Sequence, residues 1–153
     1  MKGDSSIVDL LLELKIEINE LDKDQYSPLG TALREEKFKI ARKILMHEDV
    51  EVKNGGGPFS SLMHLAVAKL EVICVEKLIE KGALINAKDA NSGDTPLHLL
   101  INVFSKNAIN AKNILLMLTS NGVEVNARNN DLWTPLHLAV KRGSYDAVDA
   151  LLS

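Results

Sequence analysis

The sequence has a single cysteine and no long hydrophobic run. One cysteine cannot form an internal disulfide bond, and we expect Cys74 to fill a small core position on a helix rather than to act as a reactive thiol. No apolar run approaches the roughly 18 residues of a membrane span. The first residues also lack the charged, apolar and cleavage-site regions of a signal peptide. These absences argue against membrane insertion and favour a reducing, intracellular setting in the cytoplasm or nucleus.

An excess of basic residues is also missing. The formal net charge is −3, which argues against nucleic-acid partners because phosphate binding needs a basic face. Hydrophobic residues make up 46% of the chain and charged residues 25%, so a core can form and disorder is excluded. The composition therefore indicates a folded domain, which we expect to be monomeric.

One short phrase recurs four times. The copies read SPLG, SLMH, TPLH and TPLH, and they begin at residues 27, 61, 95 and 134, which are 34, 34 and 39 residues apart. A Ser or Thr followed by Pro or a hydrophobic residue starts helices, because the hydroxyl caps free N–H groups and Pro suits the first helical position. An apolar stretch, a break and a second apolar stretch follow each copy. Gly82 and Gly122 lie where the second stretch should end as a helix.

The sequence resembles the ankyrin repeat family, on the TPLH phrases together with the endings GALINA at residues 82–87 and GVEVNA at residues 122–127. The unit of that family is a β-turn followed by two antiparallel helices, about 33 residues in all. The resemblance implies an all-α ankyrin-repeat α-solenoid, with helix–turn–helix repeats joined by β-turn or hairpin fingers. It also implies a protein-interaction module without catalysis.

We expect a single domain over residues 1–153, with repeats at about 22–53, 54–88 and 89–128. Residues 1–21 read as a partial repeat, because a second helix at 3–11 has no first helix before it. Residues 129–153 read as a truncated last repeat, which ends in an apolar second helix at 145–152. End repeats need a polar outer face for solubility, so we interpret the chain as a fragment of a longer protein, or as one with a covered end.

The regularly spaced histidines do not predict a metal site or a catalytic one. His64, His98 and His137 occupy equivalent positions in successive repeats, and stacked helices lie roughly 8–10 Å apart. Zinc needs its nitrogen ligands about 2.0–2.1 Å from one ion, so we expect these histidines to bond the adjacent turn instead. The run GGGP at residues 55–58 lacks the rest of a phosphate loop and is interpreted as a flexible turn. No cofactor, no metal and no enzyme activity are predicted.

The ankyrin family binds partners on a concave surface made of turn tips and first helices. Carried onto this sequence, that resemblance places Ser60 and Ala68 at the surface and predicts these partner-binding residues: Tyr26, Arg34, Glu35, Lys69, Asp94, Asn102, Trp133, Lys141 and Arg142. Trp133 is the first candidate because tryptophan is over-represented among interface hot spots. The alternative is that its ring packs over the neighbouring tip. The Lys141–Arg142 pair next to it would suit an acidic partner segment.

Several positions depart from the repeat. The 39-residue gap places extra material at residues 103–110, which should lengthen the helices or their loop, as either a surface insertion or part of a binding face. Glu36 and Leu70 stand where Gly143 stands in the last repeat, and a left-handed Leu is costly, so we expect those turns to differ. Gly30 replaces the usual histidine and should remove one turn-bracing hydrogen bond. The finger at residues 54–59 should be disordered or remodelled.

The resemblance further implies that Asn86 and Asn126 are possible substrates of an asparaginyl hydroxylase, with Leu78 and Leu118 eight residues upstream. For the whole protein, the sequence predicts binding of a peptide or a folded protein partner on the concave surface. Two alternatives stay open. The chain is a regulatory or targeting segment of a larger enzyme or channel, or a microbial or viral effector that binds a host protein.

Overall fold

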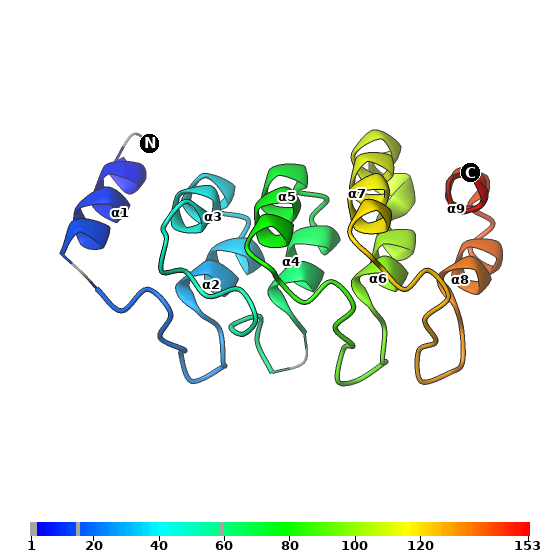
Figure 1. Cartoon of the computed structure of the whole chain (residues 1–153), viewed down its shortest axis with the longest axis horizontal. Helices are drawn as coiled ribbons and strands as arrows, with labels where there is room; N and C mark the ends of the chain where they lie inside the picture. Colours follow the sequence, from blue (N-terminus) through cyan, green and yellow to red (C-terminus); the bar gives the residue numbers. More distant parts are fainter. Residues whose placement is uncertain (1–2, 15, 59) are drawn as a thin grey trace.

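Two parallel rows of short helices run along the molecule, and loops extend from one edge of the array (Figure 1). The computed structural model describes residues 3–14, 16–58 and 60–153. The first row contains the helices that follow the repeated phrase: α2 (Pro28–Arg34), α4 (Leu62–Ala68), α6 (Pro96–Val103) and α8 (Pro135–Lys141). The second row contains α1 (Gly3–Glu13), α3 (Phe38–Leu45), α5 (Val72–Glu80), α7 (Ala108–Ser120) and α9 (Tyr145–Leu152).

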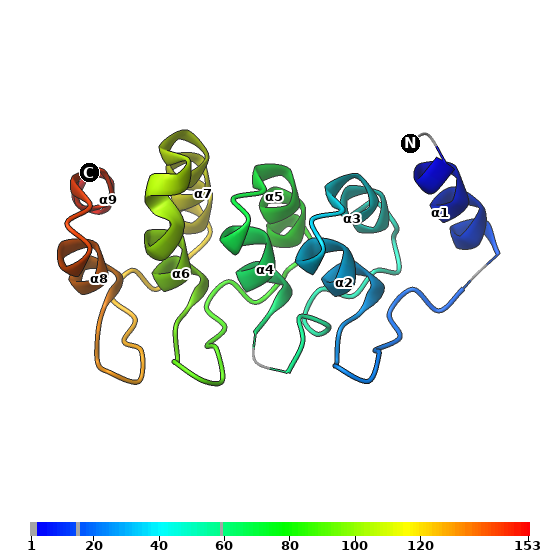
Figure 2. The ribbon, with the colours of Figure 1, turned by 180° about the vertical axis from the view of Figure 1, so that it is seen from behind.

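Each helix packs on its neighbours in the same row, and each first-row helix packs on its partner in the second row. Thus α2, α4, α6 and α8 pack in sequence, and so do α1, α3, α5, α7 and α9. The second row begins one helix earlier, and no first-row helix accompanies α1 in the part of the chain that the structure describes (Figure 2). The predicted all-α solenoid of helix–turn–helix repeats is confirmed. None of the described helices is long and apolar enough to cross a membrane.

The hydroxyl at the start of each phrase caps the first-row helix as predicted. The side chains of Ser61, Thr95 and Thr134 accept from the backbone N–H three residues on, and each belongs to a capping box completed by the histidine there. Such caps satisfy backbone donors that a helix start otherwise leaves unpaired, each worth about 1 kcal/mol. The phrase therefore sets where every first-row helix begins.

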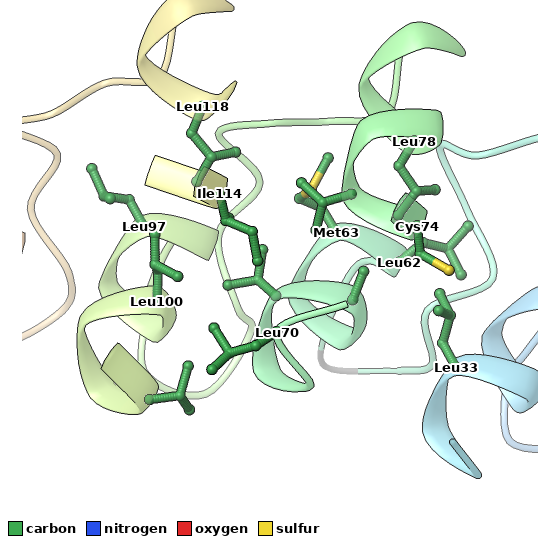
Figure 3. Packing of buried hydrophobic residues seen from close by; sticks show 14 of the residues in the cluster. Leu33, Leu62, Met63, Leu70, Cys74, Leu78, Leu97, Leu100, Ile114 and Leu118 are labelled. Atoms are coloured by element: carbon green, nitrogen blue, oxygen red, sulfur yellow. The ribbon is translucent and has the colours of Figure 1, made fainter. Parts of the chain in front are cut away.

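The core is a continuous layer of aliphatic side chains between the two rows (Figure 3). Leu97 and Leu100 of α6 and Leu118 of α7 are wholly buried, and burial of such a side chain stabilises the fold by about 1.5–3 kcal/mol. Cys74 lies in the same layer, where burial raises the pKa of its thiol to about 12. The thiol therefore stays protonated at neutral pH and acts as a small core residue, as the sequence indicated.

The turns after α2 and α4 share the left-handed backbone of the turn after α8, contrary to the sequence-based expectation. The φ angles are 59° at Glu36 and 52° at Leu70, close to the 62° of Gly143. At Leu70 the following N–H donates to Ala66, as the equivalent N–H after Gly143 donates to Ala139. Leu70 is buried, and this burial offsets the cost of a left-handed non-glycine residue. Packing thus overrides the local preference.

The extra residues of the third full repeat are built into the helices. A 3-10 turn, η1 (Phe104–Lys106), continues α6, and α7 is 13 residues long. Phe104 is completely buried and η1 contacts both α7 and α9, whereas Ser105 and Lys106 remain exposed. The expected lengthening is confirmed. The insertion is nevertheless more than a surface feature, because its aromatic ring enlarges the core.

The described residues 54–58 of the glycine-rich finger pack against the preceding finger, which supports the remodelled alternative, and residue 59 lies outside the described residues. Gly55 and Gly56 are buried, and Gly56 forms a β-bridge with Tyr26. The Gly55 carbonyl accepts from the Ser27 N–H at 3.0 Å, where an imidazole nitrogen accepts in the other three copies. A Cβ on Gly30 would overlap that carbonyl oxygen. Gly30 therefore replaces histidine because the finger backbone occupies the space of the ring.

We predict that Gly30→Ala lowers the free energy of unfolding by about 2 kcal/mol, because its methyl group displaces the Gly55 backbone. Urea denaturation followed by circular dichroism measures this. The control is Thr31→Ala at the next position, which is half-exposed and should change the stability by less than about 0.5 kcal/mol. Equal stability of Gly30→Ala and the wild type would contradict the proposed overlap.

Candidate functional site

Two histidines join each repeat to the finger of the next. His64 Nε2 lies 2.9 Å from the Asp94 carbonyl oxygen, and His98 Nε2 lies 2.9 Å from the Trp133 carbonyl oxygen. In both cases Nδ1 accepts the N–H of the residue that caps its own helix. A carbonyl can only accept and a backbone N–H can only donate, so the ring must be neutral with its proton on Nε2. These imidazoles are structural, as the sequence predicted.

His137 occupies the equivalent position in the last repeat and is exposed. Its Nδ1 contacts Thr134 Oγ1 at 2.7 Å, but its Nε2 has no hydrogen bond within the described residues. The described residues contain no group of three or more histidine, cysteine or acidic side chains placed to hold a metal ion. His64 and His98 instead join neighbouring repeats, and His137 contacts the start of its own helix.

A second set of bridges uses the asparagine of each repeat ending. Asn86 donates from Nδ2 to the Gly122 carbonyl and accepts the Glu124 N–H on Oδ1. Asn19 bonds the Asp49 carbonyl and the Glu51 N–H in the same way. Asn126 is exposed and has no such bond within the described part of the chain. Of the two asparagines proposed for modification, Asn86 is thus hydrogen-bonded to the next repeat and Asn126 lacks these bonds within the described residues.

The finger and first-row helix of the last repeat form an aromatic and cationic cluster. Lys141 Nζ lies 4.4 Å from the centroid of the Trp133 ring, and the His137 ring meets it edge-on with centroids 6.1 Å apart. Leu136 and Val140 complete a shallow apolar pocket with them, and Val140 is 65% exposed. The Trp133 ring therefore contacts its own helix. We call these five residues the Trp133 cluster.

A similar but smaller arrangement lies in the first full repeat. The Arg34 guanidinium is 4.3 Å from the centroid of the Tyr26 ring, and its Nε donates to Glu35 at 2.9 Å. Hydrogen bonds to Glu35 and then to Tyr26 raise the pKa of Arg34, which keeps the charge on the ring face. The structure thus brings three of the predicted surface residues into contact. Tyr26 is half-buried, and the two charged side chains are exposed.

The remaining predicted residues connect adjacent repeats. Lys69 Nζ donates to Glu36 at 2.6 Å, and this contact lowers the pKa of the Glu36 carboxyl. Arg142 Nε donates to Asn102 Oδ1 at 2.7 Å. Asp94 is half-buried and accepts from Asn129 at 2.7 Å, so its carboxylate is less available than the sequence suggested. These predicted surface residues are therefore each paired with a side chain of a neighbouring repeat.

The apolar part of the Trp133 cluster was not predicted from the sequence. Leu136 corresponds to Leu29 and Leu97, which are buried by the next repeat, whereas Leu136 is 37% exposed. Val140 lies one helical turn further along the same face. Only the absence of a further described helix beside α8 makes these residues surface features. A sequence signal was available, since Leu136 lies within the last described copy of the repeated phrase and Val140 follows it.

Comparison with known proteins gives consistent findings. A family model described as "Ankyrin repeats (3 copies)" matches residues 62–153. The chain is 31% identical to the nuclear factor NF-kappa-B p105 subunit of Gallus gallus, over 91% of this chain and 14% of that protein. It is 29% identical to Rabankyrin-5 of Mus musculus, over 88% of this chain and 12% of that protein. An ankyrin repeat protein of fowlpox virus is 40% identical over 51% of this chain and 21% of its own length.

The His64 bridge makes the stability depend on pH. Burial lowers the pKa of His64 below its usual 6.5, so the folded state resists a proton that the unfolded state takes up. The contribution of neutral His64 to the free energy of unfolding is complete above about pH 6.5 and is lost as the pH falls below that value. We predict that the urea midpoint decreases between pH 7.5 and pH 5.

His64→Gln should flatten this decrease, because the variant has no imidazole to protonate at that site. His137→Gln, the matched control without an inter-repeat bond, should keep the wild-type pH dependence. Denaturation midpoints of the three proteins at several pH values decide the matter. Identical pH slopes for wild type and His64→Gln would rule out His64 as the titrating group.

Proposed function

We propose that this chain, which belongs to the ankyrin repeat family, binds a protein partner on the surface formed by its fingers and first-row helices. Ankyrin repeats generally act as protein-interaction modules. The observation that carries the proposal is the Trp133 cluster, where a half-buried indole and a lysine ammonium lie beside exposed apolar side chains. Large aromatic and cationic groups around an apolar centre are typical of interface hot spots.

The chemistry of the Trp133 cluster favours a peptide segment or a folded partner with an apolar anchor and an acidic neighbour. Leu136 and Val140 can receive an apolar side chain, since both are exposed and line one shallow pocket. Lys141 already lies on the Trp133 ring, so an approaching carboxylate gains an ordered ammonium at little cost in side-chain entropy. Arg142 is held by Asn102 at the adjacent position.

The Tyr26 and Arg34 pair would form the other end of this surface. The bridges between Glu36 and Lys69 and between Asn102 and Arg142 hold the intervening helices in register. A partner that covers several repeats would therefore meet an ordered surface of mixed charge. We propose an intracellular, monomeric binding module that carries out no catalysis itself.

The chain spans 14% and 12% of two curated relatives that it matches, and the activity of a whole protein that contains it is a proposal only. The low shares are compatible with a regulatory or targeting segment of a larger enzyme or channel. The second alternative, an effector that binds a host protein, stays open as well, and one similar protein is an ankyrin repeat protein of fowlpox virus. The full gene discriminates between them, because an enzyme or channel domain supports the first and a host-targeting segment supports the second.

Asparagine hydroxylation stays a proposal, and the bonding pattern narrows it to Asn126. The amide of Asn86 is engaged on both sides by the following repeat, whereas Asn126 is exposed. A hydroxylase needs access to the side chain, so modification should be greater at Asn126. Mass spectrometry of the protein from its native cell measures this, and an unmodified Asn126 would refute the proposal.

The main prediction concerns capture of protein partners from an extract of the native cell. Trp133→Ala and the pair Lys141→Glu with Arg142→Glu should each reduce the captured partner about 10-fold or more, the loss of a hot spot. The charge-matched control, Lys39→Glu with Lys112→Glu, alters exposed second-helix positions and should retain capture. Quantitative mass spectrometry provides the readout. Full capture by both cluster variants would place the binding surface elsewhere.

A further inference from the structure

The asparagine bridges between successive repeat endings are interrupted once, in the middle of the array. Asn19 Oδ1 accepts the Glu51 N–H, and Asn86 Oδ1 accepts the Glu124 N–H, each at 2.8 Å. The N–H in each bridge belongs to the residue two places before the position of the next bridging asparagine. By the same spacing, the bridge between these two would join position 53 to the N–H of Leu84.

Position 53 is occupied by a lysine, so this bridge cannot form. A lysine ammonium has only donors, and it cannot accept a backbone N–H as an asparagine oxygen does. Within the described residues the Leu84 N–H makes no hydrogen bond, and the Lys53 side chain makes neither a hydrogen bond nor an ion pair. Both residues are exposed. This junction therefore offers two donors, one of them charged, where an amide closes two other junctions.

These donors line a groove of about 330 Å³ between the loops. Leu21 lies on one of its walls, and Leu84 and Lys88 lie on the other. The loop with residues 53–57 runs between the two loops that carry these walls (Figure 1). Glycines at residues 55–57 have no side chains to fill the space. We call this site the Lys53 groove, after the lysine that also lines it.

The Lys53 groove lies inside the array rather than at an end of it. Repeats are described on both sides of the groove, and their first-row helices α2 and α4 already pack together. A further repeat before α1 or after α9 would stack on an outer face of the array, so it would leave this groove open. Stacking repeats therefore do not cover the groove.

The charge of the groove favours an anionic occupant. Lys53 and Lys88 are exposed, and no acidic side chain is among the described residues that line the groove. Lys88 Nζ donates to the Arg128 carbonyl at 2.9 Å, which holds its ammonium in place. A carboxylate oxygen can accept the Leu84 N–H as an asparagine oxygen does at the other junctions. The same carboxylate would be attracted by Lys53.

Leu84 also adds an apolar contact that the other repeat endings lack. The equivalent positions carry Glu17, Glu51 and Glu124, whereas Leu84 is a leucine and is 47% exposed. Leu21 on the facing wall is 40% exposed. An aliphatic side chain next to the bound carboxylate would therefore remove apolar surface from water on both walls. A peptide segment can supply both groups, whereas a free carboxylate supplies only one.

We propose that the Lys53 groove binds a segment of a partner protein that carries an acidic residue beside an aliphatic one. The carboxylate takes the place of the absent asparagine oxygen at the Leu84 N–H, and the aliphatic side chain packs on Leu84 and Leu21. This surface is separate from the Trp133 cluster, because the two share none of their lining residues. A protein with both surfaces holds a partner at two points along the array.

The test follows the Leu84 amide by heteronuclear NMR while an acetylated and amidated peptide, SLELSG, is added to the chain. The Leu84 resonance should move saturably with a Kd on the order of 1 mM, since so small an interface buries few groups. The matched peptide SLQLSG lacks only the charge and should bind about fivefold more weakly or worse. Equal binding of the two peptides would overturn the proposal, as would an unmoved Leu84 resonance at several times the expected Kd.

Lys53→Asn is the most informative variant, because it restores the residue type that bridges the other junctions. Its amide should accept the Leu84 N–H and close the site, so peptide binding should fall about fivefold or more while the urea midpoint rises. Loss of binding in a more stable protein cannot result from unfolding. Unchanged peptide affinity in this variant would overturn the proposal.

Two further variants are controls for the location of the site. Lys112→Asn alters an exposed lysine on α7 and should leave the peptide affinity unchanged. Trp133→Ala should also leave it unchanged, so failure of this proposal and failure of the proposed function are distinguishable. A loss of peptide binding in either control equal to that in Lys53→Asn would place the peptide elsewhere and overturn the proposal.

Acetate distinguishes a peptide segment from a free carboxylate. Acetate alone should move the Leu84 resonance with an affinity about fivefold or more below that of SLELSG, because it lacks the aliphatic group. Equal affinities would overturn the peptide occupant in favour of a small carboxylate. Leu84→Glu introduces the residue type of the other repeat endings and should abolish saturable peptide binding, followed at the Lys53 amide. Binding equal to that of the wild type would contradict the role of Leu84.

Discussion

Every repeat in this protein buries its apolar surface only against its neighbours. A two-helix unit has too little interior of its own, so Leu97 is buried between repeats while the equivalent Leu136 is 37% exposed. The equivalent leucine thus belongs to the core in one repeat and to the surface in another. The apolar residues of the Trp133 cluster are exposed for this reason, because no further described helix packs beside α8.

Polar bridges set the spacing that this stacking requires. The imidazoles of His64 and His98 connect a helix start to the next finger, and Asn86 connects successive repeat endings. Each bridge needs one protonation state or one amide orientation, so the bridges align the repeats as well as joining them. The Trp133 cluster depends on this alignment, since the Trp133 carbonyl is held by His98 while its ring lies against α8.

Local sequence patterns predicted the helices well, but they predicted poorly the turns and the finger that depart from the repeat. The repeated phrase, its caps and the second helix at 145–152 could be read directly, because capping and apolar spacing are local properties. The turns at Glu36 and Leu70 were mispredicted because burial of a distant core outweighs a local backbone cost. The form of the glycine finger could not be chosen from the sequence, because it comes from contacts with residues 28 positions earlier, such as that between Ser27 and Gly55.

The sequence by itself determined the repeat, the start of each first-row helix and the structural role of the histidines. Only the tertiary structure decided which of the predicted surface residues pair with one another. It also decided that Leu136 and Val140 are exposed and that a groove opens between the loops beside Lys53. The physical reason is that capping and periodicity act within a few residues, whereas exposure depends on which helices stack beside each other.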